Sequence, residues 1–230
     1  MGLIDYDRCL ALQQRLVDDA VSRADRHAVV LLCEHSNVIS VGRGGSWAHL
    51  RHNQPQLSRE NVGLRWSNRG GGCQLHLPGQ LAVYPIVPLD AIGWNVGEYL
   101  RRLGQALEAT CDDVRVDTHR QAPSHGLWAR GGQVATVGAA IKHGVSYHGA
   151  QLNVEPDLRR FQQYLRVDAS QRPSSLATES RSRPSMSRVR SCLMDRLAEA
   201  FDCERLDIHT GHPLLRHAAV ASTSEVAGVV

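Results

Sequence analysis

The sequence places a run of glycines beside residues that can bind a ligand or move a proton. The segment reads Arg69, Gly70, Gly71, Gly72, Cys73, Gln74, Leu75, His76, Leu77, Pro78, Gly79 and Gln80. Successive glycines let a ligand approach the backbone, whose N–H groups can hold a carbonyl or carboxyl oxygen. The segment has neither the GK[ST] of a phosphate-binding P-loop nor a GxGxxG fingerprint. From the residues alone, a ligand-binding loop and an ordinary glycine-rich turn are equally good interpretations.

Other nucleophilic and metal-binding side chains are scattered along the chain. The six cysteines are Cys9, Cys33, Cys73, Cys111, Cys192 and Cys203. No CxxC pair occurs, so neither a zinc knuckle nor a redox motif is indicated, and we expect reduced thiols, most of them small core residues. His209 and His212 form a lone HxxH with no third ligand, for which surface histidines are the better interpretation. Lys142 is the only lysine among the 26 basic residues, so a mechanism that needs a lysine has one candidate.

Length and composition predict one globular domain. The 230 residues suffice for a full hydrophobic core, and 42% hydrophobic with 21% charged residues excludes disorder as the overall state. The sequence has no apolar run of membrane-spanning length and no signal-peptide pattern at its N-terminus, which predicts a cytoplasmic protein that does not associate with membranes. A net charge of +3 is too small to indicate a nucleic-acid partner.

The apolar spacing predicts helices and strands that alternate along the chain. Helices are expected over 7–24, 95–110 and 187–201, and strands over 28–33, 37–41, 81–87, 133–141 and 145–154. Asn95 is a suitable cap for the second helix, with Glu98 three residues on. Residues 168–188 are rich in Ser, Arg and Pro and are expected to form a loop. Hairpin patterns dominate, which favours a mixed sheet with helices packed on it.

The segment 69–80 resembles the RGG-x-x-x-x-HGPGQ signature of the lipoyl/octanoyl transferase B family. The matching residues are Arg69, Gly70, Gly71, His76, Pro78, Gly79 and Gln80. Further segments resemble family motifs in the same order, namely 35–43, 126–128, 134–138, 148–153 and 174–176. The likeness implies the α/β fold of biotin-protein and lipoate-protein ligases, with a mixed, largely antiparallel sheet flanked by helices. It places this domain over residues 1–201 and leaves 202–230 as a weakly matched tail.

Such enzymes move an octanoyl group from acyl carrier protein to a lysine of a lipoyl domain. The resemblance therefore implies octanoyl-acyl carrier protein as one partner, and lipoyl domains of 2-oxoacid dehydrogenases or the glycine cleavage H protein as the other. It implies no metal and no cofactor. In the family, a cysteine thiolate takes the acyl chain as a thioester, and a nearby lysine favours the thiolate, because a neighbouring cation depresses a thiol pKa.

The sequence departs from the family at both of these positions. Gln133 stands where the lysine is expected and Val167 where the cysteine is expected. Cys73 is the leading substitute nucleophile, although in a regular strand it points away from Gln74 and His76, which favours a structural thiol. Asp168 and Ser170 lie near the lost cysteine, with no base identifiable beside them.

The resemblance also predicts a substrate cavity. We expect it to be lined by the signature residues (Arg69, Gly70, Gly71, Gly72, Cys73, Gln74, Leu75, His76) and by two further groups (Thr136, Val137, Gly138; Gly149, Ala150, Gln151). The glycines would admit the acyl carbonyl, and Val137 would contact the alkyl chain. His76 and His148 are either acid–base residues or, as we prefer, hydrogen-bonding walls. Two functions follow: an octanoyltransferase that works slowly or with another nucleophile, and a pseudoenzyme that binds an acyl chain, acyl carrier protein or a lipoyl domain.

Overall fold

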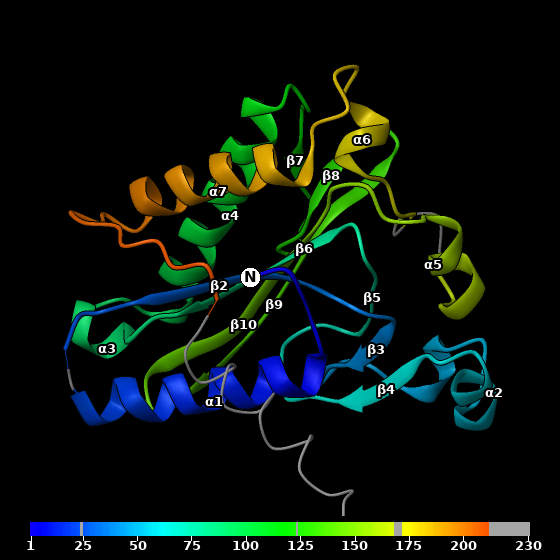
Figure 1. The fold of residues 1–230 in the computed structure, drawn as a ribbon, viewed down its shortest axis with the longest axis horizontal. Coiled ribbons are helices and arrows are strands. Elements are labelled where there is room, and N and C mark those ends of the chain that lie inside the picture. The colour runs from blue at the N-terminus through cyan, green and yellow to red at the C-terminus, as the bar shows by residue number, and fades with distance from the viewer. Residues whose placement is uncertain (24, 123, 168–171, 212–230) are drawn as a thin grey trace, which may run out of the picture.

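A seven-stranded sheet lies at the centre of the computed structural model, which describes residues 1–23, 25–122, 124–167 and 172–211 (Figure 1). In spatial order its strands are β1 (Leu3–Ile4), β2 (Val29–His35), β6 (Gln80–Ile86), β10 (Val145–Asn153), β9 (Gly132–Lys142), β8 (Leu127–Ala129) and β7 (His119–Arg120). β1 is parallel to β2, and every other neighbouring pair is antiparallel. The mixed, largely antiparallel sheet expected from the sequence is confirmed.

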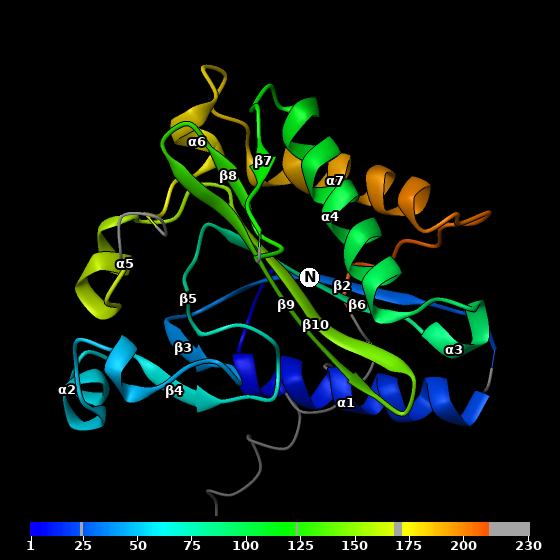
Figure 2. The ribbon, with the colours of Figure 1, turned by 180° about the vertical axis from the view of Figure 1, so that it is seen from behind.

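Helices cover both faces of this sheet. α1 (Tyr6–Arg23) packs its apolar side against β2, β6 and β10, whereas α4 (Val96–Asp113) and α7 (Met186–Ala200) pack against the other face (Figures 1 and 2). The side chain of Asn95 accepts a hydrogen bond from the backbone N–H of Glu98 at 2.8 Å, which begins α4 at the predicted cap. Among the described residues, no helix is long and apolar enough to cross a membrane.

A second, three-stranded sheet lies at one end of the large one. Its order is β4 (Gly63–Trp66), β3 (Val38–Val41) and β5 (Cys73–His76), with β3 parallel to β4 and antiparallel to β5. The short helices α2 (Gln54–Arg59) and α5 (Arg159–Tyr164) pack on its apolar side (Figure 1). The polar composition of residues 46–68 predicts no such elements, whereas the structure has a 3-10 turn, Trp47–His49, as well as α2 and β4 there.

The expected loop over 168–188 is interrupted by helical structure. α6 (Leu176–Glu179) lies within it, and α7 begins at Met186. The Ser175 side chain caps α6, and Leu176 is fully buried, so one capping serine and one anchoring leucine are enough to order the segment. Another short helix, α3 (Leu89–Ile92), follows β6. Of the expected tail, residues 202–211 form no helix or strand, and the remainder lies outside the described residues.

Candidate functional site

The glycine-rich loop 69–72 is held between the turn 42–45 and strand β9. The backbone N–H groups of Gly42, Arg43 and Gly44 each donate to carbonyl oxygens of the loop at 3.0 Å. On the other side, Gly70 N–H donates to the carbonyl oxygen of Ala139 at 2.8 Å. The loop is thus fixed by backbone hydrogen bonds on two sides, and its position depends on the small and large sheets together.

Arg69 is the central side chain of this loop. It is 4% exposed, and its guanidinium donates to the carbonyl oxygens of Ser40, Gly70 and Gly72 at 2.8–2.9 Å. Its Nε and Nη2 also donate to the Ser40 hydroxyl at 3.1 and 2.9 Å. These oxygens all belong to neutral groups, and burial lowers the pKa of Arg69. Arg69 therefore holds the loop together and supplies a buried positive charge to its surroundings.

A small cavity opens beside Arg69, on the α1 side of the large sheet. Its lining residues are Tyr6, Arg69, Gln74, His76, Tyr84, Gly138, His148, Gly149 and Ala150. Three predicted segments, namely the signature, β9 and β10, therefore meet at one place. Six of the nine lining residues have polar side chains, which could hydrogen-bond a carbonyl oxygen placed there.

Both cavity histidines are neutral hydrogen-bonding groups. His76 Nε2 is hydrogen-bonded to the Ser40 hydroxyl at 2.8 Å, and its Nδ1 to the side-chain amide of Gln151 at 2.5 Å. Burial lowers the pKa of His76 well below its ordinary value, and nearby His35 and Arg69 lower it further. Burial and the charge of Arg69 lower the pKa of His148 to about 4. Neither ring can supply a cation at neutral pH.

The alternation of side chains along the strands separates the predicted lining residues into two groups. Gln74 bonds to the Thr136 hydroxyl on the cavity side of β5. Cys73 and Leu75 lie on the opposite side, against the apolar cluster of the small sheet. Val137 packs against the core between the large sheet and α4 and does not line this cavity, so its expected contact with an alkyl chain stays a prediction. The sequence predicted that consecutive residues of each segment line the cavity. In a strand, successive side chains point to opposite faces, so only every second one can do so.

Gln133 and Val167, which stand where the family has its lysine and cysteine, make backbone hydrogen bonds and apolar contacts, respectively. The backbone N–H of Gln133 donates to the carbonyl oxygen of Arg172 at 2.7 Å, and its carbonyl oxygen accepts from Ser174 at 2.9 Å. Val167 is half-buried against the apolar cluster of the small sheet. Asp168 and Ser170, considered as substitutes, lie outside the described residues.

None of the residues that line the cavity is a cysteine. The Cys73 thiol points to the carbonyl oxygen of Ser46 at 3.6 Å, and partial burial raises its pKa. Burial likewise raises the pKa of Cys111 in α4 to about 12. Lys142 ends β9 and pairs with Asp18 at 2.8 Å in an exposed position, as its place near the hairpin turn predicts.

Sequence reasoning missed Tyr6 and Tyr84 in the cavity wall and Ser40 behind it. The Tyr6 hydroxyl is buried with no hydrogen bond of normal geometry, although the hydroxyls of Ser40 and Ser67 lie near it. Tyr84 lies in β6 with its side chain toward α1. The alternation within β6 could have placed Tyr84 on that face. Only the pairing of β3 with β5 brings Ser40 beside Gln74.

Gly138 is, with Gly149, one of two glycines in the cavity wall where a side chain would collide with backbone. A Cβ atom at Gly138 would lie 2.7 Å from the carbonyl oxygen of Gly70, which is backbone and cannot swing away. We therefore expect Gly138→Ala to lower the free energy of unfolding by about 2 kcal/mol, through displacement of the loop. Denaturant unfolding measures this, with Gly72→Ala as the matched control, since its Cβ would meet only ordinary contact at 3.8 Å. Equal stability of the two variants would contradict the close packing.

Comparison with known proteins gives consistent matches across the chain. A model of the lipoyl protein ligase A/B catalytic domain matches residues 5–202. A protein named octanoyltransferase from Solibacter usitatus (strain Ellin6076) is 34% identical over 208 residues, covering 90% of this chain and 93% of its own length. Another of that name, from Roseiflexus sp. (strain RS-1), is 32% identical over 231 residues, covering 99% and 96%.

Solved structures show the same fold at low identity. A lipoate-protein ligase A bound with ATP has a TM-score of 0.72 at 16% identity, covering 90% of this chain and 87% of that one. A bi-partite lipoate protein ligase from Thermoplasma acidophilum, studied with its E2 lipoyl domain, has a TM-score of 0.70 at 16% identity, covering 91% and 86%. The α/β fold expected from the resemblance is therefore confirmed.

Proposed function

Because the chain belongs to the lipoyl protein ligase A/B catalytic domain family, we propose that it binds octanoyl groups and their carrier proteins without holding the acyl group on a cysteine of its own. The donor would be octanoyl-acyl carrier protein. The acceptor would be a lipoyl domain of a 2-oxoacid dehydrogenase or the glycine cleavage H protein. One observation carries the proposal: the family's signature segments meet at one cavity, and no cysteine lines it.

The cavity suits the carbonyl end of an acyl group. Burial raises the pKa of Tyr6, so its phenol stays protonated and its buried hydroxyl is available to donate. The buried charge of Arg69 favours electron density on a nearby oxygen. The alkyl chain would extend out of this polar chamber, and burial of each CH₂ elsewhere would contribute about 0.8 kcal/mol.

Thioester formation lacks its nucleophile at this site, and the only positive charge in the lining is Arg69, which is engaged with backbone carbonyl oxygens. A thiolate attack needs a cysteine beside the carbonyl and a cation that lowers its pKa. His76 and His148 are neutral at the cavity, and Lys142 is paired with Asp18. We expect octanoyl transfer to be at least about 10⁴-fold slower than in a family member with both groups, because they act as a unit.

The second candidate function is octanoyl transfer by a substitute thiol. It is favoured by relatives that are named octanoyltransferase and match nearly the whole chain. The orientation of Cys73, the leading substitute, argues against it, because this side chain lies on the other side of β5 from Gln74 and His76, which line the cavity.

Mass spectrometry after incubation with octanoyl-acyl carrier protein separates the two functions. We expect no octanoyl adduct on the chain, together with measurable binding of the loaded carrier. Gln74→Trp should fill the cavity and weaken that binding about tenfold, equivalent to ~1.4 kcal/mol. Gln163→Trp, at an exposed position of α5, is the control and should bind the loaded carrier as the wild type does. A stable adduct that Cys73→Ala abolishes would establish the substitute thiol instead, and absence of both adduct and binding would refute both functions.

A further inference from the structure

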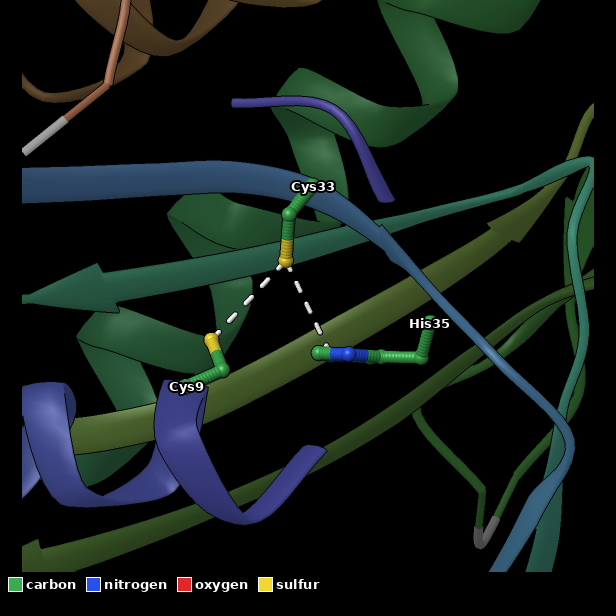
Figure 3. A group of neighbouring side chains, drawn as sticks. All are labelled: Cys9, Cys33 and His35. Atoms are coloured by element: carbon green, nitrogen blue, oxygen red, sulfur yellow. Dashed lines mark hydrogen bonds between the residues drawn. The ribbon is translucent and has the colours of Figure 1, made fainter. Parts of the chain in front are cut away.

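Three buried side chains converge behind the cavity, on the α1 face of the large sheet. Cys9 comes from α1, and Cys33 and His35 come from β2; they are 0%, 0% and 1% exposed. Figure 3 shows the two thiols and the imidazole pointing toward one another. Cys33 Sγ lies 3.8 Å from Cys9 Sγ and 3.7 Å from His35 Nε2. Within the described residues, this is the one group of three or more His, Cys, Asp or Glu side chains whose possible metal-ligand atoms all lie within 4.8 Å of one another.

These distances match the edges of a metal-centred tetrahedron. With Zn–S of about 2.3 Å and Zn–N of about 2.0 Å, tetrahedral angles place two sulfurs about 3.8 Å apart and a sulfur and a nitrogen about 3.5 Å apart. Two of the three edges, at 3.8 and 3.7 Å, fit such a tetrahedron, and the third, between Cys9 Sγ and the His35 ring nitrogen, lies within 4.8 Å. A disulfide would require the two sulfurs to approach to about 2.05 Å.

The surrounding hydrogen bonds orient the three side chains as metal ligands are usually oriented. His35 Nδ1 lies 2.8 Å from the carbonyl oxygen of Ile4, which fixes the proton on Nδ1 and leaves Nε2 unprotonated, 3.7 Å from the Cys33 sulfur. The Gln13 side-chain amide donates to Cys9 Sγ at 3.8 Å, a contact that stabilises a thiolate. The Tyr84 hydroxyl lies 2.9 Å from His35 Nε2, on the side of the cavity.

We propose that Cys9, Cys33 and His35 bind one zinc ion, which joins α1 to β2 behind the cavity. The fourth position would be taken by water or the Tyr84 oxygen. Binding releases the two thiol protons, and the dianionic thiolate pair neutralises the charge of the ion, so the buried site carries no net charge. Two thiolates with one imidazole favour zinc over magnesium or calcium, which prefer oxygen ligands.

The three side chains are already assembled without a metal ion, because the Cys9 and Cys33 thiols share a hydrogen bond at 3.8 Å and Cys33 Sγ also contacts His35 Nε2 at 3.7 Å. Since all three ligands are inaccessible in the folded chain, we expect zinc to enter during folding or through opening of α1.

The test is refolding of the full, reduced chain with Zn²⁺ or Co²⁺, followed by removal of free metal. We expect about one zinc per chain and, with cobalt, thiolate-to-cobalt charge-transfer absorption and the visible bands of a tetrahedral ion. At about 100 times the dissociation constant, zinc should raise Tm by roughly 5–10 °C. Folded wild-type protein that shows neither thiolate–cobalt absorption nor a zinc-dependent Tm would overturn the proposal, even if every variant failed to fold.

Variants assign the metal to these ligands. Cys9→Ala and Cys33→Ala should lose the zinc and its effect on Tm. Cys192→Ala, which removes another buried thiol in α7, should keep both. His209→Asn tests the HxxH pair, of which His212 lies outside the described residues, and should also keep the metal. Zinc retained in both Cys9→Ala and Cys33→Ala, or lost in His209→Asn, would place the metal elsewhere and overturn the proposal. A Cys9–Cys33 disulfide that forms in air while zinc is present would overturn it too.

Discussion

Replacement of Arg69 by alanine is expected to lower the free energy of unfolding by about 4 kcal/mol. The guanidinium donates to three backbone carbonyl oxygens and to the Ser40 hydroxyl inside the protein. The truncation removes several donors from these oxygens, although the Gly72 carbonyl keeps the Gly42 N–H and the Ser40 hydroxyl keeps His76, and it leaves a void where the side chain lay. Urea or guanidinium unfolding at neutral pH, followed by circular dichroism, measures the loss.

Arg43→Ala is the matched control for this effect. Arg43 lies in the neighbouring turn and is exposed, and its guanidinium makes one bond to the carbonyl oxygen of Asn68 at 2.7 Å. Its loss should cost no more than about 0.5 kcal/mol. Arg69→Lys should recover only part of the loss, because an ammonium cannot reproduce the planar set of donors. A cost below about 1 kcal/mol for Arg69→Ala would show that the loop is held without this side chain.

Restoration of the two family residues is expected to raise octanoyl transfer by about 100-fold over either single variant. Val167→Cys alone supplies a thiol with a pKa of about 8.5 or higher, because the activating cation is missing and the position is half-buried among apolar side chains. Gln133→Lys alone supplies the cation without a nucleophile. In the double variant the lysine lowers the thiol pKa, so the effect of the two changes should exceed the product of the single effects. Octanoyl transfer from acyl carrier protein to a lipoyl domain measures this in all four proteins.

The octanoyl transfer rate of the wild type is itself a test of the two candidate functions. Brisk transfer by the wild type that survives Cys73→Ala would contradict both the non-covalent binding role and the substitute thiol. A double variant that folds and binds loaded carrier but transfers no faster than the wild type would show that further residues around 165–173 have diverged. Binding should be equal in all four proteins, because neither Gln133 nor Val167 lines the cavity.

Local sequence patterns predicted the elements that bring the cavity together. The Asn95 cap and the apolar spacing located α4, and the two β-branched runs around 143–144 located the β9–β10 hairpin. The family signature then identified the segments that meet at Arg69. A signature names whole segments, whereas strand alternation decides which side chains face the cavity, so Leu75 and Val137 pack into apolar clusters and do not line it.

The thiol–imidazole group could not be found from spacing. Cys9 lies 24 residues before Cys33, with the rest of α1 between them, so the three residues form no short metal-binding motif in the sequence. Only the packing of α1 on β2 brings the sulfurs together. The three-stranded sheet was missed for a related reason, since β4 is four residues long and reaches β3 through a parallel pairing that leaves no hairpin pattern.

The two edges of the large sheet bear on how the protein behaves at high concentration. The outermost strands, β1 and β7, are each two residues long, and β7 consists of the exposed polar residues His119 and Arg120. Free strand edges are templates on which a second chain can add by backbone pairing, and short or charged edges resist such addition. The outermost strands β1 and β7 therefore offer few backbone groups for intermolecular strand pairing, which disfavours aggregation by addition to these two strands.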